Sequence, residues 1–365
     1  TKKGNRNEAA QIRYSFGYNI DRVNKLPDLQ TEFAQGSVQG GVPTFQAAMT
    51  GSSQRASWGP RISDLRYSTT PSIWDVNVLI VPACDPTATN IIPNIYNNAD
   101  DFFQDASNIT HNISVSGGTE KSRYFFSVGR LDQEGIMPNS DFSRTSFRAT
   151  TSSELFKNFT ATVSASYINS GGKRVQNGSN TSGVMLGLLR TSPNLDNRAG
   201  FLFEDGTQRA YRGGSIYDNP YFTVNKNFTT DDVNRIIGYT QLAYDALPWL
   251  NITYRLGIDT YGDDRIFRND INSSSVQVGQ VINQTIRSTD INSDFLITVN
   301  KEFSEKLNVN ATFGHNYFNK DVHINRIDGQ GLASPGFFNI ASATAVNVSE
   351  GVTRRELFGL FGTIT

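Results

Sequence analysis

Residues Glu8 to Asp21 read EAAQIRYSFGYNID, and this stretch decides the fold. Its apolar side chains occupy every second position from Ala10 to Ile20, and the positions between them are polar or small. Successive side chains of a β-strand point to opposite faces, so this period of two predicts a strand with one apolar and one polar face. Such a strand separates an apolar medium from a polar one.

The same alternation recurs along the rest of the chain. Further strands are predicted over residues 109–116, 123–132, 142–152, 159–168, 235–244, 250–261, 287–300, 307–316 and 353–365. Every second link is a long loop, predicted at about 22–107, 133–141, 169–232, 262–281 and 317–352, and the other links are short. Links that alternate in length are typical of an outer-membrane barrel, whose tight turns and elaborate loops lie on opposite sides of the bilayer. We therefore predict an all-β fold, a transmembrane antiparallel β-barrel.

The composition agrees with this fold class. Of the 365 residues, 37% are hydrophobic and 11% are aromatic, and the net charge is −1. A packed globule usually needs more aliphatic residues, whereas few aliphatics and many aromatics suit a barrel with one lipid face and one wet face. No apolar run reaches about 18 residues, so no transmembrane helix is predicted. The balanced charge gives no reason to expect nucleic acid as a partner.

Three local features complete this picture. Cys84 is the single cysteine, so neither an internal disulfide nor a thiolate metal cluster is expected. The chain begins at Thr1 without an initiator methionine or a signal peptide, so we expect any export signal to lie outside it. The stretch 182–190, SGVMLGLLR, predicts a short helix packed under the second long loop.

The side chains on the two strand faces differ in chemistry. The polar face is mostly Asn, Ser, Thr, Gln and Arg, which suits a crowded aqueous lumen better than the Lys and Glu of a soluble sandwich. Aromatic residues gather near the predicted strand ends. They are Tyr18, Phe142, Phe159, Tyr167, Trp249 and Tyr261. This placement favours interfacial girdles, although Tyr and Phe are enriched in any strand.

Candidate binding residues are few. Trp58 and Trp74 in the first long loop are candidates for stacking on a sugar ring, and packing within that loop explains them equally well. The pairs Asp100–Asp101 and Asp263–Asp264 could bind a hard cation, but without EF-hand spacing they are better interpreted as solvated loop carboxylates.

The sequence predicts neither a catalytic site nor a cofactor. The three histidines are too scattered for a triad or a zinc site, and His111 on an apolar strand face is interpreted as an interfacial residue. They are His111, His315 and His323. We therefore expect no enzyme activity, no cofactor and no metal.

Several motifs resemble the SusC/RagA family of TonB-linked outer-membrane transporters. The stretch His111 to Gly135, HNISVSGGTEKSRYFFSVGRLDQEG, is closely similar to a hairpin of that family. Thr1 to Gly4 is similar to the TTKKG that closes the family's plug domain, and residues 19–30 to its first barrel strand. Weaker similarities are seen at Phe142–Arg148, at Leu247–Pro248–Trp249 and in the final LFGLFGTIT.

The resemblance implies a barrel of about 22 strands, of the size class whose lumen holds a plug. Residues 1–7 would then be the end of the plug and a linker, and residues 8–365 the first part of the barrel, with about ten strands. Half a barrel leaves open edges that lipid does not tolerate, so we expect the remaining strands elsewhere. The family also implies a SusD-like surface lipoprotein, energy from TonB–ExbB–ExbD, contact with outer-membrane lipid and a host among the Bacteroidota.

The predicted function is energised import of oligosaccharides or peptides across the outer membrane. With a plug inside the lumen before the first strand, the short turns are periplasmic and the long loops extracellular. Two alternatives stay open. A surface adhesin or glycan-binding β-protein would show charged outer faces without turn asymmetry, and a passive porin would lack the plug.

Overall fold

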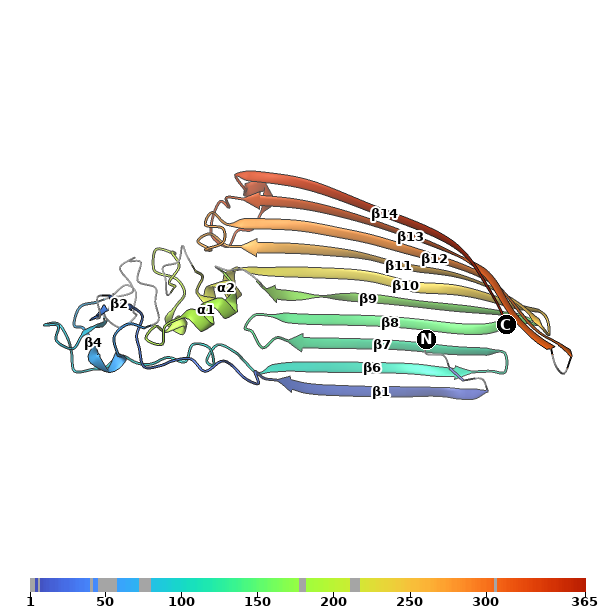
Figure 1. Cartoon of the computed structure of the whole chain (residues 1–365), viewed down its shortest axis with the longest axis horizontal. Helices are drawn as coiled ribbons and strands as arrows, with labels where there is room; N and C mark the ends of the chain where they lie inside the picture. The colour runs from blue at the N-terminus through green and yellow to red at the C-terminus, as the bar shows by residue number, and fades with distance from the viewer. Residues whose placement is uncertain are drawn as a thin grey trace.

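The computed structural model describes residues 4–5, 7–39, 42–44, 58–71, 80–176, 182–210, 217–304 and 307–365. Its main element is a 10-stranded sheet in which each strand pairs with the next one along the chain (Figure 1). The strands are β1 (Glu8–Asp21), β6 (Ala106–Gly118), β7 (Ser122–Glu134), β8 (Asp141–Phe156), β9 (Phe159–Val175), β10 (Phe228–Leu247), β11 (Leu250–Asn269), β12 (Gln280–Ser304), β13 (Leu307–Gln330) and β14 (Ala345–Ile364). All neighbours are antiparallel, and β1 and β14 form the two edges.

The predicted strands are all present, but most of them are longer than the sequence indicated. β10 begins at Phe228 instead of 235, β11 continues to Asn269 instead of 261, and β13 to Gln330 instead of 316. The predicted loops 169–232, 262–281 and 317–352 were therefore too long. In these extensions charged and amide residues occur on both strand faces, as with Asp263 and Asp264 on β11, so the regular alternation is lost while the backbone ladder continues without interruption.

The two faces of the sheet differ as predicted. The apolar face exposes large side chains, with 74% of Ile12, 47% of Phe147 and 77% of Leu360 accessible. On the polar face Thr150 and Ser164 are only 2% and 7% accessible, because their neighbours crowd them. The apolar side chains thus have no protein partner, while the small polar ones are packed as on the inside of a curved sheet.

The predicted aromatic girdle is only partly correct. Phe159 and Tyr167 lie on the apolar face, but Phe142 and Tyr261 lie in register with residues of the polar face. There the guanidinium of Arg174 lies over the Phe142 ring at 5.0 Å, and that of Arg235 over the Tyr261 ring at 5.9 Å. Position near a strand end therefore did not determine which face an aromatic side chain occupies.

The described residues of the long links gather at one end of the strands; we call them the loop assembly (the described residues within 22–105, 135–140, 176–227, 270–279 and 331–344) (Figure 1). It contains β2 (Ser37–Gln39), β3 (Val42–Thr44), β4 (Leu65–Tyr67), β5 (Ile80–Pro82), η1 (Ile62–Asp64), α1 (Val184–Arg190), η2 (Asn197–Ala199), α2 (Pro220–Lys226) and η3 (Ile340–Ser342). The predicted helix at 182–190 is confirmed by α1. Among the described residues, neither α-helix has the length and apolarity needed to cross a membrane.

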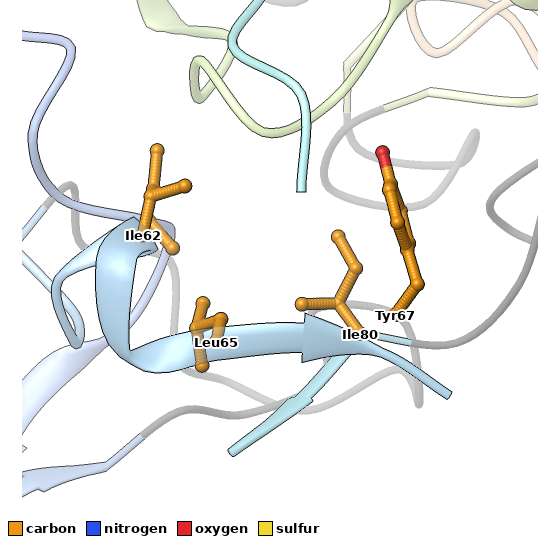
Figure 2. Close-up of a cluster of buried hydrophobic side chains, with 5 residues drawn as sticks. Ile62, Leu65, Tyr67 and Ile80 are labelled. Carbon is orange, nitrogen blue, oxygen red and sulfur yellow. The ribbon is translucent and has the colours of Figure 1, made fainter. Parts of the chain in front are cut away.

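The loop assembly has two small hydrophobic cores of its own. The first surrounds η1 and the β4–β5 hairpin and consists of Ala34, Ile62, Leu65, Tyr67 and Ile80 (Figure 2). The second joins the two α-helices to the first long loop and consists of Ala99, Phe102, Val184, Leu188 and Val224. A long loop without such a core would leave its backbone unsupported.

Candidate binding surface at the long-loop end

The polar face of the sheet changes in chemistry across its width. On β8 and β9 it includes packed hydroxyls, with Thr150 Oγ1 2.9 Å from Ser164 Oγ and Thr162 Oγ1 donating to Ser152 Oγ at 2.9 Å. From β10 to β13 it carries ion pairs: Arg235 Nε donates to Asp259 Oδ1 at 2.7 Å. Farther across, Lys320 Nζ donates to Asp290 Oδ2 at 3.1 Å. The face therefore has closely packed hydroxyl pairs on one side and Arg–Asp and Lys–Asp pairs on the other.

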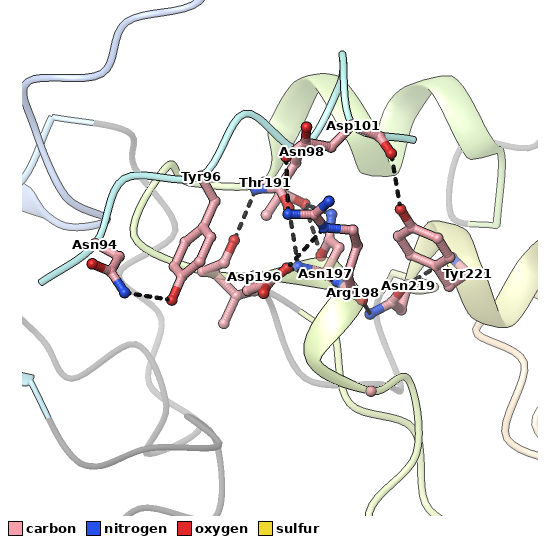
Figure 3. A network of polar contacts seen from close by, with 12 residues as sticks. Asn94, Tyr96, Asn98, Asp101, Thr191, Asp196, Asn197, Arg198, Asn219 and Tyr221 are labelled. Atoms are coloured by element: carbon pink, nitrogen blue, oxygen red, sulfur yellow. Dashed lines mark hydrogen bonds and ion pairs between the residues drawn. The ribbon is translucent and has the colours of Figure 1, made fainter. Parts of the chain in front are cut away.

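A buried network of amides connects the first long loop to the loop 176–227 (Figure 3). The Asn98 amide donates to the Leu195 carbonyl at 2.8 Å and its oxygen accepts from the Asn197 backbone N–H at 3.0 Å. The Asn219 amide then donates to the Asn197 carbonyl at 3.3 Å. Buried polar groups are costly unless they are hydrogen-bonded, so these partners specify one arrangement of the loops.

Asp218 connects the loop 176–227 to the loop 270–279. Its Oδ1 accepts from the Gln208 amide at 2.9 Å and from the Ser274 backbone N–H at 2.7 Å. Its Oδ2 accepts from the Asn227 amide and the Ser273 hydroxyl, both at 3.0 Å. Burial raises the pKa of the Asp218 carboxyl because these donors are neutral and only partly replace water.

A second buried carboxylate extends this connection to the last long loop. Asp270 is 1% accessible, and its Oδ1 accepts from the Gly336 backbone N–H at 2.7 Å. Its Oδ2 lies 3.6 Å from Nζ of Lys226 at the end of α2. Asp218 and Asp270 thus join three of the long loops, and the Asn98 contacts add the first long loop to this connected unit.

A cavity of about 770 Å³ opens where the ends of β7, β8 and β9 meet α1. Its wall is largely apolar and includes Ile136, Met137, Phe142, Val184, Met185 and Leu186. Arg174 also lines it, with its guanidinium over the Phe142 ring and its Nε 2.8 Å from Asp231 Oδ1. Asp141 and Lys173 line it as well, so the wall suits a ligand that combines apolar groups with charged or polar ones.

The two tryptophans predicted as binding candidates are not brought together in the described part of the chain. Trp58 is 59% accessible, and its ring centroid lies 5.2 Å from that of Phe33. Arg61 covers the Phe33 ring, at 5.1 Å from its centroid. Trp74 lies outside the described residues. Trp58 thus has both a packing partner and an accessible surface.

The acidic pairs are engaged by protein groups. Asp101 Oδ2 lies 3.1 Å from an Arg198 nitrogen, and Asp100 accepts from the Asn97 amide. The interpretation of Asp263–Asp264 as loop carboxylates is wrong, because both lie within β11. Asp263 is buried beside Arg265, at 2.6 Å from its Nη2, and Asp264 accepts from the Thr285 hydroxyl at 2.7 Å. In the described ranges no group of three His, Cys, Asp or Glu side chains could hold a metal ion.

The histidines lie far apart on the apolar face of the sheet. Nδ1 of His111 is 2.9 Å from the Tyr14 hydroxyl. The His315 ring stacks between Phe295 and Phe358, with centroids 5.9 and 5.6 Å away. His111 lies on the apolar strand face, as predicted, and its interpretation as an interfacial residue stays a prediction.

The buried network and the apolar cavity were both missed from the sequence. The sequence feature that pointed to the network was the abundance of Asn, Ser and Asp between 191 and 227, but this is also the ordinary composition of a loop. Their partners lie up to 99 positions away, as for Asn98 and Asn197. Sequence patterns of short range contain no information on such pairings.

Comparisons with known proteins bear on the fold. No protein-family model matches the chain, and no curated protein matches it in sequence. Solved structures do match: a chain of the RagAB peptide importer in its closed-closed state has a TM-score of 0.67 at 14% identity, over 100% of this chain and 41% of that one. The open-open state gives 0.70 at 14% identity, with 40% of that chain covered. A further RagAB peptide transporter structure gives 0.72 at 13% identity, with 41% covered.

The chain has the fold of part of a RagAB importer chain. It spans about two fifths of the length of the RagAB chains that it matches. The predicted fold class, an all-β chain that forms about ten antiparallel strands of a larger barrel, is confirmed by this match and by the antiparallel sheet. The resemblance to the SusC/RagA family, seen in short sequence motifs, is thus matched at the level of the fold.

Proposed function

We propose that this chain is part of a SusC-like barrel that imports large nutrients across the bacterial outer membrane by a TonB-dependent mechanism. The observation that supports this proposal is the asymmetry of the sheet. Its apolar side chains are exposed on one face, while polar side chains are crowded on the other. Such a sheet is stable where lipid covers the apolar face and water or a plug fills the other side. The RagAB structures, which share the fold, are peptide importers.

The orientation follows from the links. The long-loop end would be extracellular and the short-turn end periplasmic. A Cβ on Gly118 would stand 2.4 Å from the Asn5 carbonyl oxygen, so the chain before β1 crosses the sheet at the short-turn end. Gly118 shares a face with Ser116 and the other polar-face residues. This contact supports residues 1–7 as the end of a plug and its linker.

The partners proposed for the complete protein follow from this role. A SusD-like surface lipoprotein would cover the loop assembly, and TonB–ExbB–ExbD would supply the energy from the periplasmic side. The role is non-catalytic and needs no cofactor. Capture between the loops and the lipoprotein, followed by displacement of the plug, would move the substrate inwards.

Two substrate classes differ in the part of the loop assembly that they would use. The apolar cavity beside α1 favours a peptide with apolar side chains, because sugar hydroxyls would lose hydrogen bonds to water there. The exposed ring of Trp58 favours an oligosaccharide, because pyranose rings stack on accessible aromatic faces. Of the two, the cavity provides the larger buried surface, and we propose a peptide as the substrate.

The test uses the full-length protein with its neighbouring lipoprotein. Calorimetric titration with a peptide panel and an oligosaccharide panel should give binding to peptides and a several-fold weaker affinity in Met185→Glu, which places a charge on the cavity wall. Trp58→Ala should leave peptide affinity unchanged and serves as the matched variant. If the protein binds an oligosaccharide and Trp58→Ala abolishes that binding, the substrate is a glycan and not a peptide.

The import function itself is tested in cells. Uptake of the bound nutrient should stop when TonB is deleted. Uptake that continues without TonB would show a passive porin, and recovery of the protein in soluble form without detergent would show a surface β-protein of another kind.

A further inference from the structure

Charged residues on the apolar face of the sheet begin directly beyond its apolar band, on the long-loop side. On β12, Arg287 lies in the same alternation as Ile291, Ile297 and Val299, and the register with both neighbours is uninterrupted there. On β13 and β14, Asp321 and Arg354 stand directly opposite each other on this face. Both lie on the long-loop side of Tyr317 and Phe358. These charges therefore lie at the rim of the surface that we propose to contact lipid.

Two clusters of Arg, Asp and His occur at this rim, near opposite edges of the sheet. In the first, Arg130 Nε donates to Asp132 Oδ2 at 2.8 Å, and its Nη1 donates to the Thr145 hydroxyl at 2.8 Å. A further Arg130 nitrogen donates to Asp132 Oδ1. The guanidinium is thus neutralised by a bidentate carboxylate, and this first cluster has no unpaired cation to offer a ligand.

The second cluster consists of Arg287, His323, Asp321 and Arg354, and it differs from the first. His323 Nε2 lies 3.0 Å from Asp321 Oδ1, and Arg354 Nε lies 3.3 Å from Asp321 Oδ2. One carboxylate is therefore shared by an imidazole and a guanidinium. Arg287 faces His323 directly across the β12–β13 pair, so the two side chains are neighbours on one surface.

Arg287 is the group that remains available for a ligand. A Cβ on Gly262 would stand 3.0 Å from its Nη1, so the guanidinium lies over a glycine of β11. It is exposed, and no carboxylate of the described residues lies within ion-pair distance of it. Asp264, the nearest acid on β11, is held by the Thr285 hydroxyl at 2.7 Å. Glu356 lies on the other side, toward the apolar band on β14.

We propose that Arg287, with His323 and Arg354 beside it, binds the phosphate of an anionic lipid headgroup in the outer leaflet. The argument has two parts. The cluster continues directly into the exposed apolar band, where acyl chains would pack against Ile258 and Phe358, which are 42% and 65% accessible. A planar guanidinium without a protein carboxylate is also the group that best matches a phosphate. The site rests on the membrane location given under Proposed function.

The test measures lipid binding to the full-length protein in dodecyl maltoside micelles by native mass spectrometry. The probes are dioleoylphosphatidic acid, dioleoylglycerol and inorganic phosphate, which separate the headgroup phosphate from the acyl chains and from free phosphate. We expect phosphatidic acid to bind and the other two probes to bind at least about tenfold more weakly, because phosphate contact and chain packing must act together. Equal binding of dioleoylglycerol or of inorganic phosphate would overturn the proposal.

Substitutions locate the site. Arg287→Gln should weaken phosphatidic acid binding about tenfold, as expected for the loss of one charge-assisted contact, whereas Arg287→Lys should retain most of it. Arg130→Gln in the neutralised cluster is the matched control and should change it less than twofold. The site would be contradicted if Arg287→Gln and Arg130→Gln weakened binding equally. It would also be contradicted if Arg287→Gln had no effect on binding while its heat-modifiable mobility in gels showed that the variant folds like the wild type. Nutrient uptake by Arg287→Gln is measured separately, so that failure of the lipid site is distinguished from failure of the import function.

Discussion

The sheet and the loop assembly bury their side chains in opposite ways. The loop assembly encloses Leu188 and Val224 completely and hydrogen-bonds its buried amides, as a small soluble domain would. The sheet leaves many of its large apolar side chains accessible, and small hydroxyl residues on its polar face, such as Thr150 and Ser288, are buried. One region therefore contains its own core, and the other requires an external apolar medium.

The two regions therefore obtain their stability from different interactions. Backbone hydrogen bonds hold the strands in register, but the exposed apolar face gains free energy only when lipid or detergent covers it. The loop assembly depends instead on buried contacts between distant segments, such as Asp218 with Asn227 and Ser274. Perturbing one region should leave the other intact, and three predictions test this separation.

The largest effect is expected from an arginine on the apolar face. Ile258 on β11 and Ile237 on β10 are 42% and 37% accessible but lie on opposite faces. Ile258→Arg should destabilise the folded protein in lipid vesicles by up to about 2–4 kcal/mol, because the charge would enter the hydrocarbon layer. Ile237→Arg, which points to the polar face opposite Asp259, should be tolerated. Urea titration of the vesicle-bound protein measures both; equal losses would show that the apolar face does not contact lipid.

A smaller effect is expected in the loop assembly. Asn227 is fully buried, and its amide donates to Asp218 at 3.0 Å and to Ser273 at 2.9 Å. Asn227→Ala should cost about 1–3 kcal/mol, because the buried carboxylate loses a donor. Hydrogen exchange should accelerate in the loop assembly but not in β10 to β13. The exposed Asn225 at the end of α2 provides the control, and Asn225→Ala should have little effect. Faster exchange in the strands as well would show that the two regions unfold together.

The smallest effect is a dependence of loop stability on pH. Burial raises the pKa of Asp218 above its usual value of 3.8, so the folded loops retain a proton that the unfolded chain has released. Their stability should therefore fall as the pH rises from 3.8 through the raised pKa, by at most about 1.4 kcal/mol per pH unit. In Asp218→Asn this fall should be absent. Limited proteolysis of the loops between pH 4 and pH 8 compares the two proteins, and parallel profiles would assign the dependence to other groups.

Much of the sheet could be predicted from the sequence because its signal is local. The alternation from Ala10 to Ile20 assigned each side chain of β1 to a face, and the apolar run at 184–190 located α1. The strand ends were missed because Asp263 and Arg265 pair along one polar face, where alternation between apolar and polar residues no longer exists. Of the candidate binding residues, Trp58 stays a prediction, and the cavity beside α1 was not foreseen.

By itself, the sequence determined the two faces of the strands and the alternation of long loops with short turns, because both depend on residues a few positions apart. Only the tertiary structure decided which loop residues meet. Asn98 is hydrogen-bonded to Asn197, and Asp270 to Gly336, because the order of the strands brings the long loops to one end of the sheet. The same order places Arg287 beside His323 and leaves its guanidinium without a carboxylate, which the spacing of these residues along the chain did not indicate.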